Sequence, residues 1–210
     1  MNIVIVFTEL LKLVCAKCIF ANETGGSISV IYKFSDPDGV RSGKSGWSFG
    51  IVQYDILNNP NAIFALREMG FTTDEILGLK AQTISDMSTM DAKLIANKDI
   101  VDEWDRKQVD ECITWPLSLC NEVGAFFSSE YSFLHIADYH NQYGMSRGGK
   151  MHSWIKSRSG TEITPEMIRD FKYTTLYGKA QLAKNDPSED DVLRRYNNIV
   201  RISAKQEVTQ

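Results

Sequence analysis

Signals that start and stop helices recur almost without interruption from Asn59 to the end of the chain. Asn59-Pro60 has the form of an N-cap followed by a first-turn proline, and the helix that it opens is expected to end at Gly70. The next signal, TTDE at residues 72–75, has the form of a capping box. Because each such signal specifies a helix end locally, this part of the chain predicts a mainly helical fold.

Helical periodicity and further capping residues predict helices over the rest of this region. Their expected ranges are about 86 to 96, 98 to 113, 116 to 123, 128 to 143 and 148 to 157. Thr164-Pro165 starts a helix that runs to about Leu182, and Asp186-Pro187 starts the last one, which runs to about Ser203. The sequence contains no linker that would mark a domain boundary, so we expect one domain over residues 1–210.

The first 55 residues carry a different pattern. Apolar residues from Leu10 to Phe20 fit one face of a helix, and Gly25-Gly26 predicts that this helix ends near Glu23. Residues 28–34 are β-branched and aromatic, residues 36–39 have turn chemistry, and residues 47–54 again favour a strand. We therefore expect an α+β, mainly α fold with a small β-hairpin lobe at about 24–56.

Composition excludes several classes of function. With 210 residues, 43% of them apolar, the chain can bury a full core without disulfide or metal staples. Its formal charge of -4 and pI near 5.4 provide no general attraction for nucleic acid. Charged residues interrupt the apolar N-terminal stretch, which favours a buried amphipathic helix over a weak signal anchor.

Cysteine and histidine spacing gives no support to a metal site. Cys15 and Cys18 lie inside the predicted helix with no histidine nearby, so buried thiols are expected, with one disulfide as the alternative in an oxidising compartment. His135 and His140 are five residues apart and miss the spacing of four that places a ligand pair on one helix face. We expect neither a metal nor another cofactor.

Glu23 is the strongest candidate for chemistry, because it stands between the end of the predicted helix and the glycine-punctuated segment SGWSFGIVQ at residues 45–53. Hydrolysis of a glycosidic bond needs an acid that protonates the leaving oxygen. It also needs a second group that positions water or stabilises the positive charge on the sugar. Glu23 would supply the acid.

The order of helix, glutamate, strand, polar turn and the string GWSFGI at residues 46–51 resembles the lysozyme superfamily, especially phage endolysins. The same string is similar to one in chitosanases, and SFGIVQ at residues 48–53 is similar to a pattern in lytic transglycosylases. The resemblance covers about residues 10 to 55. It implies a lysozyme-like fold and a glycosidase that cuts peptidoglycan between N-acetylmuramic acid and N-acetylglucosamine. Such an enzyme is made in the bacterial host cytoplasm and acts in the periplasm or cell wall during host lysis.

The resemblance also implies roles for individual residues. Glu23 would be the general acid, and Ser48 would take the place of a threonine that holds the attacking water. Gln53 would line the cleft and hydrogen-bond to the N-acetyl sugar, with Trp47 and Tyr54 as further substrate contacts. These assignments predict one catalytic cleft beside the hairpin.

One position departs from the family pattern. Phage lysozymes and chitosanases carry an aspartate five or six residues before the hydroxyl residue, where this chain has Ser42 and Gly43. Asp36 and Asp38 are the nearest substitutes, although both also suit a turn. Either the loop brings one of them to the cleft, or the second carboxylate is missing, which would favour a transglycosylase that uses Glu23 alone.

A second cluster of polar and aromatic residues, ADYHNQY, occupies residues 137–143. Tyr139 and His140 could contact sugar rings, or the segment could be a helix with one aromatic residue buried and its polar side exposed to water.

For the whole protein, the alternatives to a muramidase are a lytic transglycosylase, a chitosanase-like glycosidase and a non-catalytic wall-binding module. Peptidoglycan is the expected partner, and a monomer without stable membrane association is the expected state.

Overall fold

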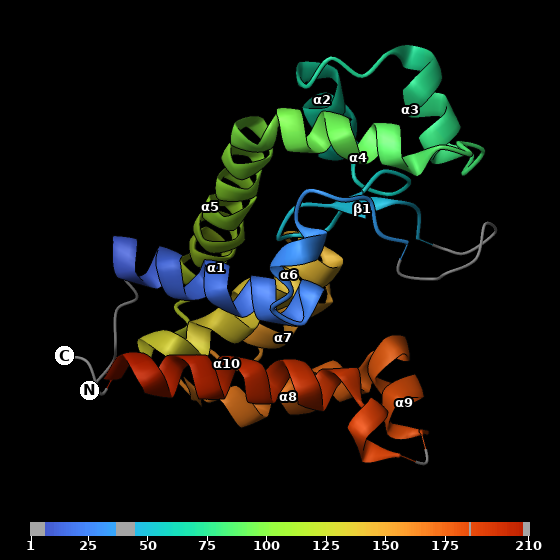
Figure 1. Cartoon of the computed structure of the whole chain (residues 1–210). Coiled ribbons are helices and arrows are strands. Elements are labelled where there is room, and N and C mark those ends of the chain that lie inside the picture. Colours follow the sequence, from blue (N-terminus) through green and yellow to red (C-terminus); the bar gives the residue numbers. More distant parts are fainter. Residues whose placement is uncertain (1–6, 37–44, 185, 208–210) are drawn as a thin grey trace. The chain divides into compact units, whose positions relative to one another are not determined.

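The computed structural model describes residues 7–36, 45–184 and 186–207. Its contacts divide the chain into two compact units. The terminal unit comprises Met1–Asn22 and Val109–Gln210, and the hairpin unit comprises Glu23–Gln108. Helix α1 (Glu9–Thr24) contains the first boundary and α5 (Lys98–Glu122) contains the second (Figure 1). The mainly helical α+β class is confirmed for the described residues.

Helix α1 ends where its sequence predicts. Its first turn is capped by Thr8, whose Oγ1 accepts a hydrogen bond from the Leu11 N–H at 3.0 Å. Its end is set by Gly25 and Gly26, which have φ angles of 64° and 79°. The buried face consists of Leu11, Val14, Cys15, Cys18, Ile19 and Asn22. The buried face of α1 therefore ends on a polar residue, Asn22, which directly precedes Glu23.

The hairpin of the hairpin unit is shorter than predicted and lies within the second predicted strand. Strand β1 (Ser48–Phe49) pairs antiparallel with β2 (Tyr54–Asp55), and Ser48 also forms a bridge with Ser35. The strand predicted over residues 28–34 is wrong, because residues 28–30 form the 3₁₀ helix η1 (Ile28–Val30). The strand predicted over residues 47–54 reverses direction, since Gly50 (φ 79°) and Gln53 (φ 54°) adopt left-handed conformations.

Four helices complete the hairpin unit: α2 (Pro60–Glu68), α3 (Thr73–Lys80), α4 (Met87–Ala96) and the first part of α5. The Asn59 cap and the Thr72 capping box are confirmed. In the box, Thr72 Oγ1 accepts from the Glu75 N–H at 3.2 Å, and Glu75 Oε2 accepts from the Thr72 N–H at 2.8 Å. Phe34 packs edge-on against Phe49 and Phe71, which joins the hairpin to these helices in one core.

Helix α5 joins two helices that the sequence predicts separately, over 98–113 and 116–123. Pro116 lies inside it and removes one backbone hydrogen bond. The helix continues because apolar residues are buried both before and after the proline, with Ile113 and Leu119 fully enclosed. Tertiary burial therefore outweighs the local cost of the proline.

The terminal unit contains the remaining helices. They are η2 (Glu130–Phe133), α6 (Leu134–Tyr143), α7 (Lys150–Lys156), α8 (Pro165–Thr174), α9 (Leu176–Leu182), η3 (Pro187–Glu189) and α10 (Asp191–Glu207). The helix predicted from 164 to 182 is two helices, because Thr175 ends α8 and its side chain caps α9. A parallel pair of short strands, β3 (Phe126–Phe127) and β4 (Glu162–Ile163), is not predicted by the sequence. Helix α10 packs on α6 and α8 (Figure 1).

Among the described residues, none of the helices combines the length and apolar character that a membrane span requires.

Candidate functional site

Glu23 is the penultimate residue of α1 and its side chain is half-buried. The two positive-φ glycines that follow at once prevent the helix from continuing. The residue before it, Asn22, is only 2% exposed. Glu23 therefore stands where a buried helix gives way to the chain that leads into the hairpin unit.

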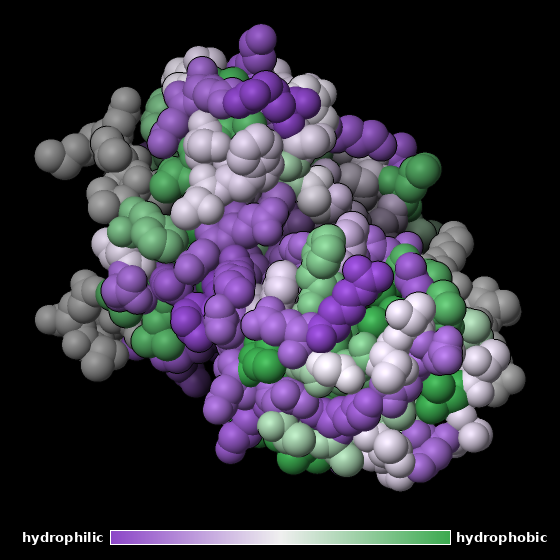
Figure 2. Space-filling view, turned by 90° about the horizontal axis from the view of Figure 1, so that it is seen from above, coloured by the Kyte–Doolittle hydropathy of each residue, from purple (hydrophilic) through white to green (hydrophobic). Residues whose placement is uncertain are grey.

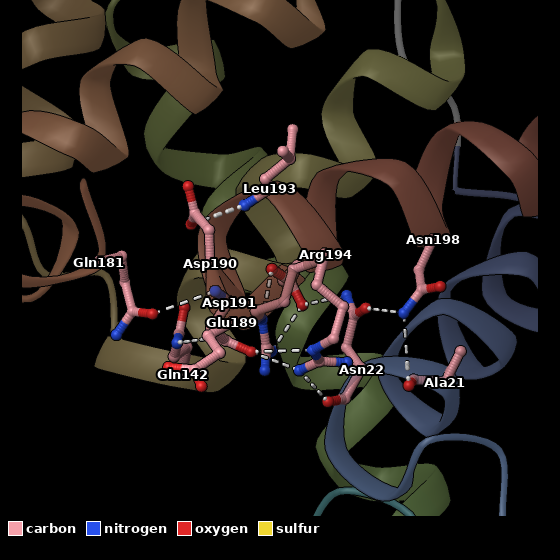
Figure 3. A network of polar contacts seen from close by, with 12 residues as sticks. Ala21, Asn22, Gln142, Gln181, Glu189, Asp190, Asp191, Leu193, Arg194 and Asn198 are labelled. Atoms are coloured by element: carbon pink, nitrogen blue, oxygen red, sulfur yellow. Dashed lines mark hydrogen bonds and ion pairs between the residues drawn. The ribbon is translucent and has the colours of Figure 1, made fainter. Parts of the chain in front are cut away.

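Asn22 is held by hydrogen bonds on three sides. Its Nδ2 donates to Asp138 Oδ1 at 2.9 Å, and its Oδ1 accepts from Asn198 Nδ2 at 3.0 Å. Its carbonyl oxygen accepts from Arg194 Nη2 at 2.9 Å (Figure 3). Because these partners belong to α6 and α10, rotation of the last turn of α1 would break several buried hydrogen bonds. The backbone next to Glu23 is thus fixed.

Asp138 forms the centre of this network in the terminal unit. Its carboxylate accepts from Lys172 Nζ at 2.7 Å and from Arg195 Nη2 and Nε at 2.7 and 3.2 Å. All three side chains are buried. Burial alone would raise the pKa of Asp138, but Arg195 and Lys172 outweigh it and hold that pKa far below its usual range. The carboxylate therefore stays charged inside the protein.

The network continues along the start of α10, where Asp191 accepts from Tyr177 at 2.9 Å and pairs with Arg194. The Asp191 N–H donates to Gln181 Oε1 at 3.1 Å (Figure 3). Burial opposes ionisation of Asp191, but Arg195 and Arg194 lower its pKa overall. These contacts fix the helix that supplies Arg194 and Arg195.

Ser48 and Gln53 make hydrogen bonds within the hairpin. Ser48 is 1% exposed, and its Oγ donates to the Gly46 carbonyl at 3.3 Å. Gln53 Nε2 donates to the Gly50 carbonyl at 2.8 Å, while its Oε1 accepts from Ser35 Oγ at 2.5 Å. Both side chains thus have structural contacts. Their predicted roles toward water and sugar stay predictions.

Tyr54 belongs to the core, and its predicted contact with substrate stays a prediction. It is 1% exposed, and its hydroxyl donates to the Trp104 carbonyl at 2.5 Å. Its ring also packs on Phe49. Trp47, in contrast, is half-buried, and its Nε1 is a buried donor that has no acceptor among the described residues. Trp47 therefore keeps an unused polar group in the predicted motif.

The predicted second carboxylate has two candidates, and the structure describes one of them. Asp36 is half-buried and follows the bridge residue Ser35. Asp38 lies outside the described residues, as do Ser42 and Gly43. The second carboxylate therefore stays a prediction.

Asp105 is a site residue that sequence reasoning misses. It lies on α5, is 3% exposed, and accepts hydrogen bonds from the backbone N–H groups of Ile51 and Val52, at 2.9 and 3.4 Å. Burial raises the pKa of Asp105 to about 7. Its partners are more than 50 residues earlier in the chain, so no local pattern marks it.

Tyr139 and His140 are buried in the terminal unit, and the polar side of their helix, which the structural alternative places in water, is buried as well at Asp138. Tyr139 is 7% exposed and its ring packs on those of Tyr143 and Phe171. His140 Nδ1 accepts from the Met145 N–H at 2.8 Å, and burial lowers the pKa of His140 to about 4. Their predicted contact with substrate stays a prediction. Their neighbour Asp138, which that prediction passes over, is the important residue of the segment.

Exposed apolar side chains, green in Figure 2, interrupt the polar surface. The side chain of Phe64 is 55% exposed and lines a pocket of about 310 Å³ whose lining residues begin just after β2. Asn58, Arg67 and Lys80 line the same pocket. An exposed ring beside amide and cationic groups is a surface that can contact sugars and carboxylates.

The cysteines are buried thiols, as the sequence predicts. Within the described ranges, Cys15, Cys18, Cys112 and Cys120 are all buried and form no disulfide. Burial raises the pKa of the Cys120 thiol to about 12, so it is not a reactive thiolate at neutral pH. In the described ranges, no three ligating side chains form a cluster that could hold a metal ion.

These residues supply a carboxyl group on a fixed helix end and a short hairpin tied to a buried carboxyl. Such an arrangement suits proton transfer to a bound substrate, because the acid is placed before the substrate arrives. Comparison of the chain with protein-family models, curated proteins and solved structures found no match.

Proposed function

We propose that this protein is a peptidoglycan-degrading glycosidase that acts as a phage endolysin, with Glu23 as its general acid. The observation that carries the proposal is the position of Glu23, directly after Asn22, whose side chain is buried and bonded to Asp138 and Asn198. A catalytic acid needs a fixed backbone, and buried hydrogen bonds from a second layer of residues provide one. The motif at residues 46–53 supplies the hairpin beside which such an acid works.

In the hydrolytic reaction, Glu23 donates its proton to the glycosidic oxygen between N-acetylmuramic acid and N-acetylglucosamine. The bond from that oxygen to the anomeric carbon breaks, and the alcohol leaves. Water then adds to the anomeric carbon and loses a proton to a base, which produces a new reducing end. Ser48 or Asp36 would have to assist the water.

A second route has a specific observation in its favour, namely the burial of the Ser48 hydroxyl and its contact with Gly46. Without a group that holds water, the 6-hydroxyl of the muramic acid residue can attack its own anomeric carbon. Glu23, now a carboxylate, takes the proton from that hydroxyl and is restored as an acid. No water is consumed, and the product is a 1,6-anhydro sugar.

Purified protein added to isolated sacculi tests the proposal, with mass spectrometry of the soluble fragments. We expect wild-type protein to release muropeptides and Glu23→Gln to lose activity by on the order of 10²- to 10⁴-fold. Glu9→Gln is the matched control, because Glu9 is an exposed carboxylate in the first turn of the same helix. Wild-type release by a folded Glu23→Gln variant would contradict the proposal.

The fragments also separate the mechanisms. Reducing ends indicate hydrolysis, whereas 1,6-anhydromuramic acid ends indicate the intramolecular route. Release of products from chitosan but not from sacculi would replace the substrate with a chitosanase-like one. Binding to sacculi without any release would point to a non-catalytic wall-binding module.

A further inference from the structure

The turn between β1 and β2 rests on a carboxyl group that comes from α5. Asp105 Oδ2 accepts from the Ile51 N–H at 2.9 Å, and Asp105 Oδ1 accepts from the Val52 N–H at 3.4 Å. The two N–H groups are consecutive, so one side chain binds both, while the preceding Gly50 N–H donates to the Ile31 carbonyl at 2.9 Å. This turn lies inside the motif that runs from Trp47 to Gln53.

Close packing at Gly50 makes the fit specific. A Cβ atom on Gly50 would lie 2.5 Å from Asp105 Oδ1, which is inside van der Waals contact. Gly50 also has a φ angle of 79°, which side chains other than glycine rarely adopt. The backbone of the turn thus approaches the carboxyl group as closely as glycine permits.

The groups around Asp105 offer it no opposite charge within the described part of the chain. Asp102 lies nearly one turn earlier on α5 and is itself an acid, and the Tyr32 hydroxyl donates to Asp102 at 2.8 Å. Residues 50 to 52 of the turn carry no charge. An ionised Asp105 is therefore stabilised by two backbone N–H groups alone, against the full cost of its burial.

We propose that Asp105 is a positioning residue whose protonation state controls how firmly the turn, and with it the segment from Trp47 to Gln53, is held. The part that concerns catalysis rests on the proposed function. Protonation of one carboxyl oxygen leaves the other to accept from a backbone N–H of the turn.

The direction in which the pKa of Asp105 is shifted determines how pH changes the stability of the docked turn. Burial raises the pKa of Asp105 to about 7 from an ordinary value of 3.8, so the docked turn favours the protonated acid. As pH rises through about 7, the acid ionises, and the turn loosens to let water reach the carboxylate. The stabilising contribution is complete below about pH 4 and is lost between about pH 4 and 7.

NMR of the backbone amides tests this inference without any assay of activity. Between pH 5 and 9, we expect the Ile51 and Val52 amide signals of wild-type protein to shift with a midpoint near 7. Their hydrogen exchange, corrected for base catalysis, should be faster at pH 9 than at pH 5 by on the order of 10-fold. Asp105→Asn mimics the neutral acid and should abolish the midpoint, whereas Asp102→Asn should keep it.

Activity on sacculi gives the second measurement. If the turn positions the site, kcat of wild-type protein falls above pH 7, and this decline is absent in Asp105→Asn. Should Asp105→Asn fail to fold, Asp105→Glu keeps an acid with a different reach, and its midpoint should move away from that of wild-type protein. An amide midpoint near 7 that survives in Asp105→Asn, or no midpoint in wild-type protein, would overturn the inference. Protein that lacks activity but shows the midpoint would refute only the proposed function.

Discussion

Two buried aspartates anchor the two units of this protein in opposite electrostatic states. Asp138 in the terminal unit is 1% exposed and pairs with Lys172 and Arg195. Asp105 in the hairpin unit is 3% exposed, and its hydrogen-bond partners within the described ranges are two backbone N–H groups. Burial raises the pKa of both carboxyl groups. Two cations reverse that effect for Asp138, and two amide groups do not for Asp105.

The comparison shows that the partners of a buried carboxyl group, and not its depth, determine its charge at neutral pH. A carboxylate with two cations forms a permanent fixed point. A carboxyl group with amide donors alone can change its state within the pH range in which proteins work. The helix end that carries Glu23 belongs to the first kind, and the hairpin turn belongs to the second.

The largest effect is expected when the buried ion pairs of Asp138 with Lys172 and Arg195 are removed. Asp138→Asn leaves Lys172 and Arg195 buried without a carboxylate, and we expect a loss of about 3–5 kcal/mol in the free energy of unfolding. Urea unfolding at pH 7 measures it. Asp170→Asn is the control, because Asp170 pairs with Arg169 at the surface and should lose at most about 1 kcal/mol. Equal losses in the two variants would refute the comparison.

The next largest effect is expected when a side chain at Gly50 displaces the Asp105 carboxyl group from the hairpin turn. Gly50→Ala introduces a Cβ atom 2.5 Å from Asp105 and places alanine at a φ angle of 79°. We expect a loss of about 2–4 kcal/mol, from backbone strain and from displacement of the carboxyl group. Thermal unfolding measures this loss. Gly70→Ala is a useful control, because Gly70 has a similar φ angle of 78° but open space around its Cβ position. A similar loss in both variants would mean that strain alone, without the Asp105 contact, explains the effect.

The pH dependence of stability sharpens the comparison further. Relative to Asp105→Asn, wild-type protein should lose about 1–3 kcal/mol between pH 5 and pH 8, because only wild-type protein must bury a new charge. Using the difference between the two proteins removes the contribution of His140, whose lowered pKa acts with the opposite sign below about pH 6.5. Urea unfolding at both pH values measures it. A constant difference across this range would contradict the assignment of a pKa near 7 to Asp105.

The smallest expected effect concerns Tyr54, the first residue of strand β2. Tyr54→Phe removes one buried hydrogen bond to the Trp104 carbonyl and keeps the ring, so a loss of about 1 kcal/mol is expected. Chemical unfolding at pH 6 measures it. No change in the midpoint of the Ile51 and Val52 amide titration should accompany the loss, since the Tyr54 hydroxyl donates to a backbone carbonyl and not to a group that titrates. A shifted midpoint would mean that the two contacts act as one unit.

Local signals account for the elements that the sequence predicts correctly. The capping box at Thr72 and the end of α1 at Gly25 depend on residues within one helical turn, and both are confirmed. The strand predicted over residues 28–34 is absent from those residues. Their β-branched side chains favour a strand, but residues 28–30 form a 3₁₀ helix and the Ile31 carbonyl accepts a hydrogen bond from the Gly50 N–H. The helix break predicted before Pro116 is also absent there, since burial on both sides of the proline keeps α5 continuous.

The sequence by itself determined a mainly helical α+β chain, the end of the first helix near Glu23 and the glycine-rich motif that follows. It made Glu23 a candidate because that signal is local. Only the tertiary structure decided that Asn22 is fixed by Asp138 and that Asp105 holds the turn, since these partners lie 116 and 54 residues apart along the chain. Charge and hydrogen-bond partners at such separations are set by packing, and packing depends on the whole chain.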